Sequence, residues 1–125
     1  MVIFVFGNPD VHEDALPLKI LPRLRERFAD IQFKTVDPNE ELETPEEIVV
    51  IDTVMGIENV TLLHGLEKFI PAPRVTMHDF DALAQLRYLK KLGKIKKVAV
   101  IGVPSALSEN EAFNGISAIL SANQF

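Results

Sequence analysis

Phe6-Gly7-Asn8-Pro9-Asp10-Val11-His12-Glu13-Asp14 joins an apolar run, Met1 to Phe6, to a segment that begins near Asp14. The apolar run is rich in β-branched and aromatic residues, which is typical of a strand buried on both faces. The later segment carries apolar residues at intervals of four, which predicts an amphipathic helix from about Asp14 to Ala29. In α/β proteins the polar loop between such a strand and helix is a common place for functional groups. Taken alone, the stretch fits a sharp turn with solvated acids better than a functional loop.

The rest of the chain repeats this alternation of strand and helix patterns. Further strands are expected at four places: Ile31 to Val36, Ile48 to Ile51, Val60 to Leu63 and Val98 to Val103. The third of these follows its predecessor after a short connection, so it is expected to run antiparallel to that predecessor. Two more helices are expected, one from about Asp79 to Leu92 and one after a capping box formed by Ser108 and Glu111.

This order of elements predicts an α/β protein of a defined kind. Strands that are apolar on both faces, interleaved with amphipathic helices, favour a three-layer α/β/α sandwich. A chain of 125 residues fits a single domain over residues 1–125. The expected sheet is twisted and mainly parallel, with about five strands, one of which is an antiparallel edge strand. In such sheets the functional crevice lies beyond the carboxyl ends of the strands.

Composition and motifs exclude several classes of function. A net charge of −5 argues against nucleic-acid binding, and the absence of cysteine excludes disulfides, thiolate metal sites and cysteine nucleophiles. No glycine-rich nucleotide-binding loop and no G-x-S-x-G elbow is present. No stretch approaches the roughly 18–20 apolar residues of a membrane span, and the apolar start is too short for a signal peptide. A cytoplasmic location is therefore expected.

Three residues at expected strand ends are candidates for a metal site. Asp14 follows the first strand and its loop, Asp52 ends the expected central strand, and His78 precedes the second helix. Two carboxylates and an imidazole form an oxygen and nitrogen donor set that suits a divalent ion and leaves positions for water or substrate. We expect the three side chains to meet at one rim of the sheet.

Each candidate also has a structural interpretation. Asp14 could serve as a helix N-cap, Asp52 could start an ordinary turn, and His78 could be a hydrogen-bonded histidine beside a capping residue. His12 and Glu13 lie close enough in sequence to support Asp14 or to replace it.

Four short blocks of sequence occur in the order found in a known family. They are Phe4-Val5-Phe6-Gly7-Asn8-Pro9 followed by Glu13-Asp14, Val49-Val50-Ile51-Asp52-Thr53-Val54, Val75-Thr76-Met77-His78-Asp79-Phe80 and Val100-Ile101-Gly102-Val103-Pro104. Together they span nearly the whole chain and resemble the nickel-iron hydrogenase maturation endopeptidases. The first resembles that family's strand, Gly-Asn dipeptide and acidic pair, and the third resembles its Ser-x-His segment.

The resemblance implies a metal-dependent endopeptidase. Such an enzyme removes a C-terminal peptide from the nickel-loaded precursor of the hydrogenase large subunit, which would be the partner of this chain. It also implies that Asp14, with Glu13 as the alternative, acts with Asp52 and His78 as both the metal-binding and the catalytic residues. The implied metal is nickel carried by the substrate, and another divalent metal is a further possibility.

The chain also departs from that family. One glycine precedes Asn8 where the family has a G-x-G-N run, and Val36-Asp37-Pro38-Asn39-Glu40 stands in place of an Asp-Gly-Gly-Thr-type loop associated with substrate recognition. These departures leave two alternatives to the peptidase. One is a non-catalytic α/β domain of the same lineage that binds a metal or a partner, and the other is a protein that shares only the fold.

Overall fold

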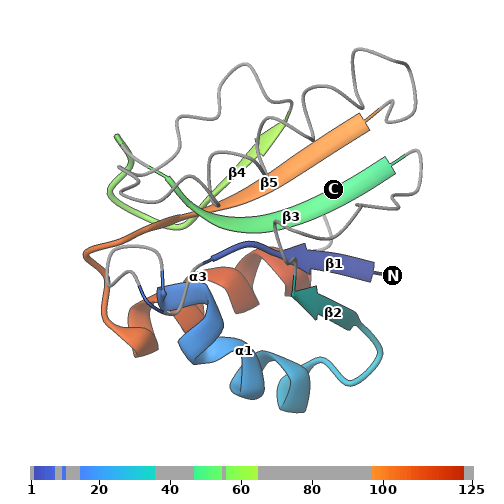
Figure 1. Ribbon diagram of the computed structural model, residues 1–125. Helices are drawn as coiled ribbons and strands as arrows, with labels where there is room; N and C mark the ends of the chain where they lie inside the picture. Colours follow the sequence, from blue (N-terminus) through green and yellow to red (C-terminus); the bar gives the residue numbers. More distant parts are fainter. Residues whose placement is uncertain are drawn as a thin grey trace.

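The computed structural model describes residues 2–7, 10, 15–35, 47–54, 56–64 and 97–122. These ranges hold five strands and two helices (Figure 1). In chain order the elements are β1 (Val2–Val5), α1 (Leu16–Arg27), β2 (Gln32–Thr35), β3 (Glu47–Val54), β4 (Thr61–His64), β5 (Lys97–Pro104) and α3 (Glu109–Ala122).

The strands form one mixed sheet in the order β2-β1-β3-β5-β4. Neighbouring strands are parallel except for β4, which pairs with β5 in the antiparallel direction. The mainly parallel sheet with one antiparallel edge strand is therefore confirmed. The strand β4 runs opposite to its predecessor β3, as expected, but β5 lies between the two, so β4 and β3 are not neighbours.

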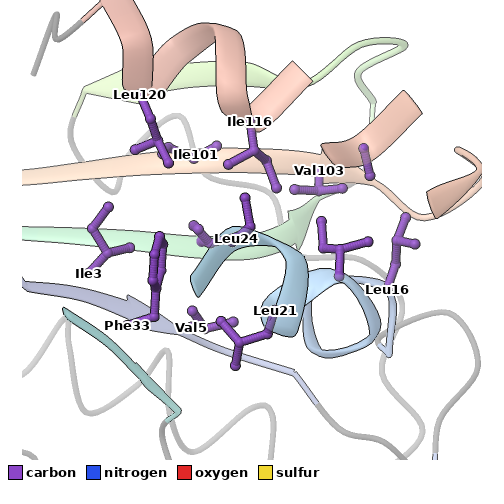
Figure 2. Close-up of a cluster of buried hydrophobic side chains, with 13 residues drawn as sticks. Ile3, Val5, Leu16, Leu21, Leu24, Phe33, Ile101, Val103, Ile116 and Leu120 are labelled. Atoms are coloured by element: carbon purple, nitrogen blue, oxygen red, sulfur yellow. The ribbon is translucent and has the colours of Figure 1, made fainter. Parts of the chain in front are cut away.

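Both described helices cover the same face of the sheet (Figure 1). Side chains from α1 and α3 meet the sheet residues that point toward that face, and Figure 2 shows the resulting core. Its members with no exposed surface are Ile3, Val5, Ile20, Leu24, Ile51, Ile101, Val103, Ala112 and Ile116.

The opposite face of the sheet is apolar as well. Its buried side chains are Phe4, Phe6, Ile48, Val50, Val54, Val98 and Val100. Burial on both faces explains why the expected central strands read as unbroken apolar runs instead of alternating ones. Of the described elements, no helix lies over this second face, and the helix expected from Asp79 to Leu92 falls outside the described ranges.

The first helix begins later than its sequence pattern predicts. Ala15 occupies the N-cap position and makes no side-chain capping bond, so the capping position does not fall on Asp14. At the other end of α1, Arg25 donates from Nη2 to the backbone oxygen of Phe33 at 3.1 Å, which ties the last turn to β2. Arg23 donates to Oδ1 of Asn110 at 2.9 Å and lies over the Phe113 ring, which ties α1 to α3.

The capping box predicted for the last helix is present. The Glu111 backbone N–H donates to Ser108 Oγ at 3.1 Å, and the Ser108 N–H donates to Glu111 Oε1 at 3.2 Å. Each side chain thus satisfies a backbone donor that the first helical turn leaves without an intrahelical partner.

Replacing Ser108 with alanine is expected to lower the free energy of unfolding by about 1 kcal/mol, because the first turn loses its capping oxygen. Urea denaturation followed by circular dichroism measures this difference. Ser108→Asp keeps an acceptor at the cap and should retain most of the stability. An alanine variant as stable as the wild type would contradict a stabilising role for the box.

Ser117 is a polar residue in the buried surface of α3. It is 7% exposed, and its hydroxyl has no hydrogen-bond partner among the described residues. A buried hydroxyl without a partner costs free energy, and serine is a weaker helix former than alanine. Ser117→Ala is therefore expected to raise the free energy of unfolding by about 0.5–1 kcal/mol, which thermal or urea denaturation can measure. Ser121→Ala, an exposed change in the same helix, is the control for propensity alone.

Candidate functional site

The order of the strands places a topological switch point between β1 and β3. After β1 the chain passes through α1 to β2 on one side, whereas β3 lies on the other side of β1 and leads on to β4 and β5. Successive connections leave in opposite directions here, and in sheets of this topology the functional crevice lies beyond the carboxyl ends of the two strands at the switch point. The backbone continues this pairing past β1, where the Phe6 N–H donates to the Ile51 oxygen at 2.9 Å. The next residue on β3 is Asp52.

Asp52 is a buried carboxylate near the carboxyl end of β3. The residue is 0% exposed, and its Oδ1 accepts a hydrogen bond from the backbone N–H of Thr53 at 2.8 Å. The sequence predicted that the central strand ends at Asp52, and this boundary is wrong. Ladder pairing with β5 continues to Val54, so Asp52 lies within the strand and is held by regular backbone pairing.

The sheet surrounds Asp52 with apolar groups. Asp52 pairs with Gly102 on β5, while Phe6 continues β1 on its other side. Along β3, Val50 and Val54 flank it on the same face because side chains alternate along a strand. Asp52 therefore points to the face opposite α1 and α3, in a frame of apolar side chains and one glycine. In such surroundings electrostatic interactions are stronger than in water.

The other predicted ligands lie outside the described residues. Asp14, together with His12 and Glu13, belongs to the stretch that connects β1 to α1, and in sequence Asp14 directly precedes the buried residue Ala15. His78 belongs to the stretch between β4 and β5. Within the described residues, no three His, Asp or Glu side chains come close enough together to hold a metal ion. The convergence of the trio thus stays a prediction.

Asp52 by itself fits the proposed donor set. A carboxylate is a suitable ligand for a divalent ion, and the Thr53 N–H fixes the position of one of its two oxygens. Orientation of a ligand by such a hydrogen bond is a regular feature of metal sites. If Asp14 and His78 reach this rim, the set gains a second carboxylate and an imidazole nitrogen.

Gly102 belongs to this site, although the residue patterns gave it no role there. A Cβ built on Gly102 would lie 2.7 Å from Cγ2 of Val54 and 3.2 Å from Cδ1 of Ile57. The signal was visible in the sequence, because a glycine inside an apolar strand marks a place where other atoms approach the backbone closely. Its partner Asp52 could be identified only from the register of β3 and β5.

The fold and the position of Asp52 define an α/β protein with a mixed, mainly parallel sheet and a buried carboxylate at its switch point. The same fold is found in the hydrogenase maturating endopeptidase HybD from E. coli. That structure matches with a TM-score of 0.58 and 14% sequence identity, over 98% of this chain and 94% of HybD. The resemblance seen in the sequence is thus confirmed for the fold. No protein-family model and no curated protein sequence matches the chain.

Neither of the two described helices is long and apolar enough to cross a membrane.

Proposed function

We propose that this chain is a metal-dependent endopeptidase that removes a C-terminal peptide from the nickel-loaded precursor of a hydrogenase large subunit. The observation that carries the proposal is the fully buried Asp52 at the switch point of a sheet that has the HybD fold. In open α/β sheets functional groups lie beyond the carboxyl ends of the strands at the switch point, so the place of Asp52 favours a functional role. The proposed setting is the cytoplasm.

In this proposal the nickel ion belongs to the substrate. Asp52 would bind it through a carboxylate oxygen, and Asp14, or Glu13 in its place, would act with His78 as the other ligands. When bound, the ion supplies Lewis acidity that polarises the scissile carbonyl or activates a water molecule. A carboxylate that does not bind the ion tightly can accept the proton released in hydrolysis.

The apolar frame of Asp52 has two consequences for this chemistry. Phe6, Val50 and Val54 exclude water from the sheet side of the carboxylate, which strengthens its interaction with a cation. The ladder hydrogen bonds of β3 hold the backbone of Asp52, so the carboxylate needs little reorganisation when the substrate arrives. The chain thereby contributes a preorganised anionic ligand.

Incubation with a hydrogenase large-subunit precursor tests the proposal. Nickel-loaded precursor should lose its C-terminal peptide, which mass spectrometry detects, and precursor without nickel should remain intact. Asp14→Asn and His78→Ala should each abolish cleavage, whereas Asp30→Asn, an exposed aspartate in the turn after α1, should not. Divalent-ion binding that depends on Asp52, with no cleavage of any nickel-loaded precursor, would instead establish a non-catalytic metal-binding domain.

A further inference from the structure

Gly102 lies beside Asp52 on the neighbouring strand, and the space of its missing side chain is already filled. The two residues are paired in the register of β3 and β5. The atoms that fill the space belong to Val54 and Ile57, and Cγ2 of Val54 would lie 2.7 Å from a Cβ at position 102. Real Cβ atoms essentially never approach another carbon so closely, so any side chain at 102 requires Val54 to move.

Val54 connects this close contact to the candidate site. It is 3% exposed and stands on the same face of β3 as Asp52, at the next position on that face. Cγ2 of Val54 lies close to the position that a Cβ of Gly102 would take on β5. The Val54 side chain therefore lies next to the Asp52–Gly102 pair on the same face of the sheet.

The geometry points to Gly102 as a positioning residue for Asp52. We infer that the absence of a side chain at position 102 lets the Val54 side chain pack over the Asp52–Gly102 pair. Val54 in turn holds the Asp52 carboxylate against the Thr53 N–H. A methyl group at 102 would push Val54 toward or away from Asp52 and change the orientation of the carboxylate. The role as a metal ligand rests on the proposed function, whereas the orientation of Asp52 does not.

The structure supplies a matched control for this inference. Gly115 on α3 is a second glycine with a filled side-chain space, because a Cβ there would lie 2.6 Å from Cγ2 of Val60. Gly102→Ala and Gly115→Ala therefore introduce the same atom with a similar overlap. They differ in location, since Gly115 lies on the helix that covers the face opposite Asp52.

Amide NMR of Thr53 reports the orientation of the Asp52 carboxylate, because the Thr53 N–H donates to Oδ1. Gly102→Ala should shift the Thr53 amide proton and speed its hydrogen exchange more than Gly115→Ala does. In Gly102→Ala/Val54→Ala, which removes both Val54 methyl groups, the Thr53 resonance should match that of Val54→Ala alone, because the added methyl group then has no Val54 side chain to displace. Val54→Ala alone removes atoms without adding any, so it provides a foldable variant in which the same resonance should also move.

A Thr53 amide unchanged in both Gly102→Ala and Val54→Ala would overturn the inference, as would an equal response to Gly115→Ala. Should Gly102→Ala fail to fold, the side-chain carboxyl carbon resonance of Asp52 in Val54→Ala decides instead, because Thr53 adjoins Val54 in the chain and its amide shift responds to that substitution in any case. Nickel titration of the folded variants tests the proposed function separately. If the wild type binds nickel, Gly102→Ala should weaken that binding by roughly 10-fold or more, as loss of a supporting residue does in metal sites. A shifted Thr53 amide in a chain that binds no nickel supports the positioning role and contradicts the metal-binding one.

Discussion

Replacement of Asp52 by asparagine is expected to abolish cleavage of a nickel-loaded hydrogenase precursor and to leave the protein folded. The carboxylate supplies the negative charge that a divalent ion requires, and asparagine has the same shape without that charge. Loss of a supporting group in a metal site already costs about 10–100-fold, so loss of the ligand itself should cost at least about 100-fold in activity. Single-turnover cleavage, measured with enzyme in excess over precursor, gives the rate directly.

Two substitutions at position 52 distinguish the effect of the negative charge from the effect of the hydrogen bond to Thr53. Asparagine retains an Oδ1 that can accept from the Thr53 N–H, whereas alanine removes this acceptor from a fully buried site. Loss of one intramolecular hydrogen bond costs about 0.5–1.5 kcal/mol, so Asp52→Ala should be less stable than Asp52→Asn by about that amount. Urea denaturation of the two variants measures the difference.

The exposed Asp30 provides the control for the charge change. Asp30→Asn should cleave the precursor at the wild-type rate and unfold at the wild-type urea concentration. Full activity in Asp52→Asn would rule out a charged ligand at this position. Full loss of folded structure in Asp52→Asn would show instead that the carboxylate is needed for the fold, and the activity of that variant would then carry no information about catalysis.

The fold was largely predictable because it follows from local patterns. Unbroken apolar runs such as Val98 to Val103 identify strands buried on both faces, and the Ser108–Glu111 capping box marks the start of α3 at its observed place. The partner of β4 was not predictable, because a short connection favours a hairpin with β3. The insertion of β5 between them depends on contacts far apart in the sequence.

The site was predictable only in part. The position of Asp52 after a buried apolar run indicated that it lies near the carboxyl end of a strand, and the structure places it there, fully buried. Its apolar frame could not be predicted, since Phe6, Asp52 and Gly102 belong to three strands whose register is set by the whole sheet. The start of α1 was predicted about two residues too early, because periodicity defines the body of a helix better than its first residue.

The second large effect is a loss of stability expected for Gly115→Ala, because α3 packs closely on the segment before β4. A Cβ at Gly115 would lie 2.6 Å from Cγ2 and 2.7 Å from the Cβ of Val60. Overpacking of this kind costs about 1–3 kcal/mol. Alanine is about 1 kcal/mol more favourable than glycine inside a helix, which offsets part of that cost. Gly115→Ala is therefore expected to lower the free energy of unfolding by up to about 2 kcal/mol, against the direction that helix propensity alone predicts.

A double-mutant cycle of Gly115 with Val60 separates the cost of overpacking from the gain in helix propensity. Val60→Gly removes both clashing atoms, so in that background Gly115→Ala should raise the free energy of unfolding by about 1 kcal/mol. Val60→Ala keeps the Cβ at 2.7 Å and should relieve the clash only in part. Asn114 is exposed in the same helix, so Asn114→Ala changes helix propensity without changing a packing contact. It should raise the free energy of unfolding by roughly a few tenths of a kcal/mol. Additive effects of Gly115→Ala and Val60→Gly would mean that α3 and Val60 do not touch, because only residues in contact couple by about 0.5–3 kcal/mol.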